Sequence, residues 1–353
     1  MFEIDFLPVG DGNGDAICMQ YSGDGGGIYV HVVDGGYSAT GEKIVEHIQE
    51  HYGRDYFISH MVLSHADNDH ANGLVEVMKK MTVKNLWMNR PWLFAAQTID
   101  HFHGRYTLEG LVKKMRDMHP YLVELEELAA KQGTAVHDVF QGAQIGKFTV
   151  LAPSRDRYIR LIPDLDKTPT RHTVADSLGT ILGEALRKVR DMLAETWDIE
   201  TLSNNPDPTS ASNETSVVQL GELEGQRLLL TADVGPEGLN EAADYAQSNG
   251  RLKIPNVIQI PHHGSRRNVT PTVLDRWIGK KVSKDITCGV AICSVSDAKT
   301  EFPRGQVNNA FLRRGYPVYV TRGNKLMHHS GSTRGWPNAS PLPFEPRVED
   351  KAA

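Results

Sequence analysis

Short apolar segments alternate with glycine-rich turns over the first sixty residues of the chain. The segments at 2–9, 16–21 and 28–36 are rich in β-branched and aromatic residues and predict three strands, and a fourth is expected at 57–63. Between the third and fourth strands, the apolar residues of 42–53 have helical spacing, which predicts a short amphipathic helix. Strands that alternate with helices in this way are typical of an α/β fold.

The same alternation continues to about residue 330, after which the composition changes. We expect further strands at 83–89, 135–140, 147–154, 216–223, 227–235, 256–265, 289–295 and 317–321, and helices at 73–81, 108–118, 121–133, 238–250, 271–280 and 306–315. The pattern therefore predicts one domain over 1–330, with helical elaborations at about 91–130 and 155–210. The second elaboration contains one expected helix, at 175–197, and is either a lid or a structural appendage. Residues 331–353 are rich in Ser, Pro and Gly and predict a loosely ordered tail.

Composition places the chain among ordinary globular proteins. Hydrophobic residues make up 40% of the 353 residues, and no apolar run reaches the 18 residues or so of a membrane-spanning helix. The N-terminal residues lack the basic start and apolar core of a signal peptide. Cys18, Cys288 and Cys293 form no CxxC pair, and the last two flank an apolar stretch, so we expect core thiols and a reducing, cytoplasmic setting.

Charge is distributed unevenly along the chain. The net charge of −6 argues against a protein that coats nucleic acid electrostatically. Residues 251–353, however, hold 17 Lys and Arg against 7 Asp and Glu, whereas residues 1–250 hold 21 against 37. This asymmetry is compatible with an anionic substrate near the C-terminal part, and equally with solvated surface charge.

The segment 64–73, SHADNDHANG, concentrates side chains that bind metals. Four such residues fall within six positions directly after the expected strand at 57–63, namely His65, Asp67, Asp69 and His70. The alternating spacing predicts a compact loop, and imidazole with carboxylate suits Zn, Mn or Fe. The alternative is a solvated polar turn before a helix, with Asp69 or Asn72 as its N-cap.

Three other expected strands also end in metal-binding side chains. Asp34 follows VHVV, Asp233 follows RLLLTA, and His262 and His263 follow VIQIP. A buried strand seldom ends in an unpartnered carboxylate or imidazole, because removing such groups from water is costly. The four strand ends are therefore expected to converge on a single site.

The order of these motifs resembles the metallo-β-lactamase superfamily. In that superfamily HxHxDH, a distant Asp and a distant His build a two-metal site, and the branch around the ComEC competence proteins has Asp where Asp67 stands here. GNGDAI near the start, NETSVV before LLLTAD, PHHGS and the VYVT strand also resemble that branch. The resemblance spans about 1–330 apart from 91–130 and 155–210, and it implies a four-layer αββα sandwich.

The resemblance also implies a role for each residue of the site. His65 and Asp67 resemble ligands of a first metal, Asp69, His70 and His263 resemble ligands of a second, Asp233 resembles the bridging carboxylate, and Asp34 resembles the residue that orients a ligand histidine. Many members supply another first-metal histidine where this chain has Asn213. Asn213 would be a neutral, weaker ligand, which favours Mn over Zn in the first position.

The expected activity is hydrolysis with two divalent ions, Zn or Mn, and a hydroxide that bridges them. Asp69 and Asp233 would contribute to catalysis through the metals, and His262 would stabilise developing charge or protonate the leaving group. Arg266 and Arg267 are candidates to hold a phosphate, or else face solvent. The main hypothesis is a phosphodiesterase or nuclease that acts on nucleic acid or nucleotides. The alternatives are a hydrolase of a small ester, lactam or thioester, and a binding or regulatory module with weakened catalysis.

Overall fold

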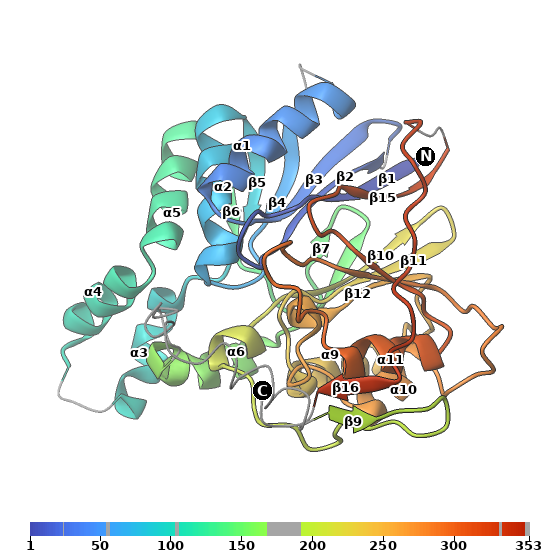
Figure 1. The fold of residues 1–353 in the computed structure, drawn as a ribbon. Coiled ribbons are helices and arrows are strands. Elements are labelled where there is room, and N and C mark those ends of the chain that lie inside the picture. Colours follow the sequence, from blue (N-terminus) through green and yellow to red (C-terminus); the bar gives the residue numbers. More distant parts are fainter. Residues whose placement is uncertain (24, 54–56, 103–105, 168–191, 332–333, 350–353) are drawn as a thin grey trace, which may run out of the picture.

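Two seven-stranded sheets form the centre of the molecule (Figure 1). The computed structural model describes the chain apart from residues 24, 54–56, 103–105, 168–191, 332–333 and 350–353. The first sheet has the order β15-β1-β2-β3-β4-β5-β6, with strands β15 (Leu326–Ser330), β1 (Phe2–Phe6), β2 (Ala16–Ser22), β3 (Ile28–Gly35), β4 (Ile58–Val62), β5 (Val83–Trp87) and β6 (Ala135–His137). The second sheet has the order β14-β13-β12-β11-β10-β8-β7, with strands β14 (Val318–Val320), β13 (Val290–Cys293), β12 (Val257–Gln259), β11 (Gln226–Leu230), β10 (Val218–Leu223), β8 (Phe148–Ala152) and β7 (Gln144–Ile145).

Three hydrophobic cores separate four layers. The inner faces of the two sheets meet in a core that joins Phe2 and Ile17 of the first sheet to Phe148 and Leu228 of the second. On the outer face of the first sheet lie α1 (Ser38–His47), α2 (Asn68–Lys80) and α5 (Pro120–Gln132). On the outer face of the second sheet lie α9 (Pro236–Ser248), α10 (Pro271–Ile278) and α11 (Gly305–Arg313). The predicted αββα four-layer sandwich is thus confirmed.

Parallel pairing brings the chemically important strand ends to one edge. β3 pairs parallel with β4 in the first sheet, and β11 pairs parallel with β12, and β12 with β13, in the second. The carboxyl ends of parallel neighbours lie at the same edge of a sheet, which is where α/β proteins place their sites. The hydrophobic pattern predicted the strands. Their parallel pairing places the polar residues that follow them at the same edge of each sheet.

Close helix-to-strand packing positions the start of α2. A Cβ added at Gly73 of α2 would overlap the carbonyl oxygen of Gly35, the last residue of β3. A Cβ at Gly41 of α1 would likewise overlap the carbonyl of Gly73. Glycine at these positions lets α1, α2 and β3 approach more closely than any side chain allows, so α2 is held directly against the end of β3.

The elaborations contain short helices and loops. Residues 91–130 form a 3-10 turn (Pro91–Phe94), α3 (Ala95–Thr98), a further 3-10 turn (Ile99–His101), α4 (Leu108–Met118) and most of α5, while α6 (Arg155–Leu161), a 3-10 turn (Ile162–Lys167), β9 (Met192–Ala194) and α8 (Ala211–Glu214) lie in or next to 155–210. Most of the helix expected at 175–197 lies outside the described residues. Its expected end was wrong, because residues 192–194 form strand β9.

The described part of the C-terminal tail contacts the rest of the chain at two places, although most of its residues are partly or fully exposed, and the loosely ordered tail stays a prediction. β16 (Arg347–Glu349) pairs antiparallel with β9. Arg334 donates hydrogen bonds to Asp5 at 3.0 Å and to Glu3 at 2.5 Å, both buried on β1. A composition rich in Ser and Pro does not reveal such partners, which lie more than 150 residues away in the sequence.

Two further expectations concern the cysteines and the membrane. Cys18 and Cys293 are buried, but Cys288 is exposed because it precedes β13 in the loop, so the expectation of a core thiol at Cys288 was wrong. No helix among the described residues is long and apolar enough to cross a membrane.

Candidate metal centre

Four strand ends meet at one edge of the sandwich, two from each sheet. Asp34 belongs to the end of β3 and His65 follows β4, whereas Asp233 follows β11 and His263 follows β12. Several of these turns have left-handed backbone conformations at residues other than glycine, with φ of 58° at Asp34 and 56° at His263. Such conformations are uncommon for residues with a Cβ and often accompany functional sites.

The SHADNDHANG segment is divided between a turn and a helix. His65 lies in the turn after β4, and Asp67 is the N-cap residue of α2, which begins at Asn68. Asp69 and His70 therefore lie in the first turn of α2, so the expected compact loop was only half correct. The alternative N-caps, Asp69 and Asn72, are not used. Because the helix begins at residue 68, the His70 side chain points toward Asp34 at the end of β3 and is fully buried.

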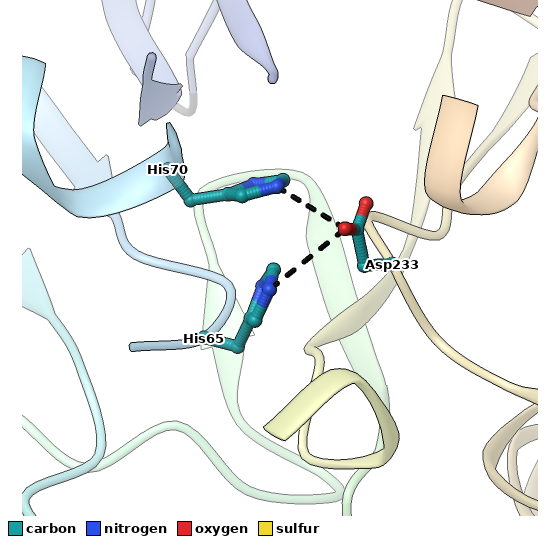
Figure 2. Close-up of side chains that lie close together, drawn as sticks. All are labelled: His65, His70 and Asp233. Atoms are coloured by element: carbon teal, nitrogen blue, oxygen red, sulfur yellow. Dashed lines mark ion pairs between the residues drawn. The ribbon is translucent and has the colours of Figure 1, made fainter. Parts of the chain in front are cut away.

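The carboxylate of Asp233 is the common neighbour of four imidazoles, and the rings of two of them, His65 and His70, point toward it in Figure 2. Its Oδ2 is 3.4 Å from His70 Nε2 and 3.9 Å from His65 Nε2, which approach it from the first sheet. From the second sheet, His262 Nε2 is 3.6 Å from Oδ2, and His263 Nε2 is 3.7 Å from Oδ1. Four imidazoles from residues up to about 200 positions apart thus surround one buried carboxylate.

Each imidazole uses its other nitrogen for a hydrogen bond directed away from Asp233. Nδ1 of His65 lies 3.0 Å from Ser64 Oγ, and Nδ1 of His70 lies 2.7 Å from Asp34 Oδ2. Nδ1 of His263 lies 2.8 Å from the backbone carbonyl oxygen of Ser294. Among the described residues, Nε2 of His65, His70 and His263 has no hydrogen-bond partner although each is buried. Hydrogen bonding at one ring nitrogen, with the other left bare and directed inward, is the arrangement of metal-binding histidines.

The distances around Asp233 test whether a metal fits. They run from 3.4 to 3.9 Å, beyond the 2.7–3.2 Å or so of an N–H···O hydrogen bond. Zinc bonds of about 2.0–2.2 Å, set at a tetrahedral angle, hold two ligand atoms roughly 3.4 Å apart, and wider angles lengthen this separation. Ligand atoms of Asp69, His70 and His263 lie within 4.8 Å of one another, as do those of His65, His70 and Asp233. The donor set and its spacing therefore fit divalent metal ions.

Without metal, the charged side chains of the site strongly shift one another's pKa. Burial by itself lowers the pKa of His70, but the carboxylates of Asp233 and Asp34 outweigh burial and raise that pKa well above its usual value. Burial alone would raise the pKa of Asp233, yet the imidazoles of His262, His263 and His70 hold it well below the ordinary range. The carboxylate is thus kept ionised, which is the form in which a carboxylate binds a metal.

The other expected site residues lie nearby with differing partners. Asp67 Oδ2 is 3.5 Å from His65 Nε2, and Asp67 Oδ1 accepts a 2.5 Å hydrogen bond from Ser212. The amide nitrogen of Asn213 lies 2.8 Å from Thr209 Oγ1 and 3.1 Å from His262 Nδ1. Its assignment as a ligand stays a prediction.

The arginine pair follows the histidine turn directly. Arg266 is half-buried, whereas Arg267 is exposed, with Nη2 3.9 Å from Asp207. Arg267 therefore matches the alternative of a solvent-facing arginine, and Arg266 does not.

Three residues near the centre were missed by sequence reasoning. Asp15 is 2% exposed, and its ligand atom lies within 4.8 Å of those of Asp233 and His263. Burial raises the pKa of Asp15. Its position in GNGDAI was a usable signal, because that motif already supported the family resemblance. Ser212 and Asn268 had no comparable signal, since isolated polar residues in loops are common.

Comparison with known proteins gives structural matches alone. No protein-family model and no curated protein matches the chain. The chain is similar in arrangement to Zn(2+)-bound PqqB from Methylobacterium extorquens, at 11% identity and a TM-score of 0.42, over 93% of this chain and 100% of that one. It is also similar to a metal-dependent hydrolase of the beta-lactamase superfamily, at 11% identity and a TM-score of 0.42, over 94% and 100%. A putative metallo-beta-lactamase from Thermotoga maritima matches at 10% identity and a TM-score of 0.34, over 73% and 94%. The zinc and the activities in these descriptions belong to those proteins.

Proposed function

We propose that the protein is a metal-dependent hydrolase with two divalent ions, Zn or Mn, at the Asp233 centre, and that it cleaves phosphodiesters of nucleic acid or nucleotides. The observation that carries the proposal is the convergence of four imidazole Nε2 atoms on Asp233 at 3.4–3.9 Å. Burying a carboxylate and several imidazole nitrogens without hydrogen-bond partners costs free energy. A bound metal ion compensates for this cost, because it binds the carboxylate and the imidazole nitrogens.

The two sides of the cluster would hold one ion each. His65 and Asp67 with Asp233 would form the first ligand set, and Asp69, His70 and His263 with Asp233 would form the second, as the family resemblance implies. The closeness of Asp67 to His65, and of Asp69, His70 and His263 to one another, supports this division. Two divalent ions so placed supply an activated water and polarise the bond to be cleaved. This chain's own residues keep the ions in place: Asp34 and the carbonyl of Ser294 fix the rings of His70 and His263.

The preference for a phosphodiester rests on the paired ions and on the arginine pair beside the histidine turn. Paired divalent ions suit phosphoryl chemistry, and Arg266 and Arg267 follow the histidine turn. The basic character of the C-terminal part is less informative than its charge count suggests, because several of its arginines pair with carboxylates of the protein. Arg313 is 2.9 Å from Glu195, and Arg314 is 2.8 Å from Glu200.

The activity test uses the full-length chain, stripped by chelator and reloaded with Zn or Mn. Substrates are single- and double-stranded DNA, RNA, a cyclic dinucleotide, bis(p-nitrophenyl) phosphate and a p-nitrophenyl carboxylic ester. We expect phosphodiester cleavage that chelator abolishes and metal restores, and loss of at least about a hundredfold in Asp233→Ala and His70→Ala. Asp244→Ala, with a side chain 73% exposed, is the control and should match the parent.

Other outcomes distinguish the alternatives. Turnover of the carboxylic ester alone would overturn the phosphodiester assignment while keeping the hydrolase. Metal binding without turnover of any substrate class would favour the binding or regulatory module. Undiminished turnover in Asp233→Ala would refute the metal centre itself.

A further inference from the structure

The first ligand set has fewer donors than the second. Besides the shared Asp233, the family resemblance gives the first set His65 and Asp67 and the second set Asp69, His70 and His263. Asp67 Oδ2 lies 3.5 Å from His65 Nε2, and ligand atoms of Asp69, His70 and His263 lie within 4.8 Å of one another. With Asp233 counted in both sets, the first set has three protein donors and the second has four, so a first ion held by as many protein donors as the second needs one more. We infer that His262 Nε2 is the remaining protein ligand of the first ion, and that Asn268 fixes the ring that presents it. This inference rests on the proposed metal centre, and it replaces the expected role of His262 in protonating the leaving group.

The hydrogen bonds of Asn268 determine which nitrogen of His262 carries the proton. Asn268 is fully buried, and its amide nitrogen donates to the backbone carbonyls of Asp233 at 2.8 Å and Val234 at 3.3 Å. Because those partners are acceptors, the amide orientation is determined, and its oxygen faces His262 Nδ1 at 2.9 Å. An amide oxygen accepts only, so Nδ1 donates and Nε2 of the neutral ring carries a lone pair.

That lone pair is directed at the bridging carboxylate. Nε2 of His262 lies 3.6 Å from Asp233 Oδ2, compared with 3.9 Å for Nε2 of His65, which approaches the same oxygen. Two acceptors that face each other at this distance repel, and a cation between them removes the repulsion. The ligand-to-ligand separation fits the roughly 3.4 Å or more expected across a zinc ion.

The backbone fixes the approach of His262. Its φ of 46° and ψ of 51° are left-handed, and its N–H donates to the carbonyl of Ala232, next to Asp233, at 3.0 Å. The neighbouring His263 has φ 56° and ψ 22°, so successive left-handed residues place both imidazoles on the same carboxylate. His262 Nε2 meets Oδ2, which His65 and His70 also approach, and His263 Nε2 meets Oδ1, so the two neighbouring rings reach different oxygens of Asp233.

Asn213 supports His262 from behind rather than supplying the ligand. Its amide nitrogen lies 2.8 Å from Thr209 Oγ1 and 3.1 Å from His262 Nδ1. Because an NH2 group cannot donate to Nδ1–H, the tautomer with its proton on Nδ1 requires the Asn213 amide to turn over and present its oxygen to both partners. Nδ1 is the nitrogen opposite the metal-facing Nε2, so Asn213 contacts the outward edge of the ring. The geometry therefore gives the ligand role to His262 and a positioning role to Asn213.

The test measures metal content as well as activity. The full chain is loaded with zinc, desalted and analysed by inductively coupled plasma mass spectrometry. We expect two zinc ions per parent chain, one per His262→Ala chain, and two per Asn213→Ala chain. His101→Ala, which removes an exposed imidazole outside the site, should keep two and controls for adventitious binding.

The outcomes separate this inference from the proposed function. A parent chain that retains no zinc refutes the metal centre. Two ions in both the parent and His262→Ala refute the role of His262 alone, and loss of an ion from Asn213→Ala but not from His262→Ala assigns the ligand to Asn213 instead.

A measurement on the parent protein avoids dependence on variant folding. Nitrogen-15 spectra of the histidine rings, recorded during zinc titration, report which ring nitrogens bind metal. We expect Nε2 of four rings, those of His65, His70, His262 and His263, to move to the metal-bound position. Only three such rings, with His262 unchanged at saturating zinc, would overturn the inference.

Discussion

Replacement of Asp34 by asparagine tests how the protein positions a metal-binding histidine. The buried Asp34 carboxylate accepts hydrogen bonds from Ser64 N–H at 2.8 Å on Oδ1, and from Ser64 Oγ at 2.6 Å and His70 Nδ1 at 2.7 Å on Oδ2. Asparagine of the same shape has one oxygen and one NH2 group. Whichever way the amide turns, a donor faces either the Ser64 N–H or the His70 Nδ1–H.

The expected magnitude follows from these contacts. A hydrogen bond to a charged group contributes about 1.5–3 kcal/mol, so metal-free Asp34→Asn should be less stable by at least that amount. If the amide NH2 faces His70, the ring must move its proton to Nε2, the nitrogen that faces Asp233. Loss of a group that orients a ligand weakens metal binding by about 10–100-fold. At about 1.4 kcal/mol per tenfold, this corresponds to roughly 1.4–2.8 kcal/mol.

Two assays measure the two effects. Urea unfolding of the metal-free protein gives the change in stability, and competition with a chromophoric chelator gives the zinc dissociation constant. Asp244→Asn is the control, because its side chain is 73% exposed and it loses only a surface ion pair with Arg276; it should leave zinc binding unchanged and lower stability by less than about 1 kcal/mol. If Asp34→Asn unfolds and binds zinc like the parent, Asp34 does not position His70.

Three further predictions concern packing, a buried ion pair and a buried histidine. Gly73→Ala should cost about 1–3 kcal/mol in urea unfolding and weaken zinc binding, because its Cβ would overlap the carbonyl of Gly35 at the end of β3. Gly110→Ala, at an exposed position of α4 where the added Cβ meets only the capping Thr107 hydroxyl at 3.2 Å, should change stability by no more than about 1 kcal/mol, and equal effects would refute the packing argument. Arg334→Ala should cost about 1.5–3 kcal/mol by removing charge-assisted hydrogen bonds to two buried carboxylates of β1, which keep Gln20, His47 and Tyr52 as partners. Arg276→Ala, whose partner is exposed, should cost less than about 1 kcal/mol, and a small loss in both would show that the tail is not anchored there. Burial, with a smaller contribution from His137, lowers the pKa of His60 to about 4. The unfolded chain, with an ordinary pKa near 6.5, therefore binds this proton more readily than the folded chain. The contribution of His60 to stability is thus lost as the pH falls from about 6.5 toward 4. An NMR titration of the His60 ring should show this pKa, and an ordinary value near 6.5 would contradict it.

The sequence by itself predicted much of the architecture. Periodic apolar segments located most strands and the main helices, because their periods of two and 3.6 residues require one buried face. Polar groups at the ends of apolar strands identified the region of the site, since Asp34 and Asp233 need partners once buried. The αββα arrangement followed from the resemblance of the ordered motifs, and the two sheets with helices outside confirm it.

The tertiary structure decided the details on which chemistry depends. The direction of each imidazole is determined by its outward partner, such as Asp34 for His70 and the Ser294 carbonyl for His263, and no local pattern encodes those pairings. Asn268 was missed because its role depends on hydrogen bonds to the backbone carbonyls of Asp233 and Val234, more than thirty residues earlier in the sequence. Local sequence determines which segments bury an apolar face and where polar groups must find partners. Which partner each one meets is decided only when the two sheets pack together.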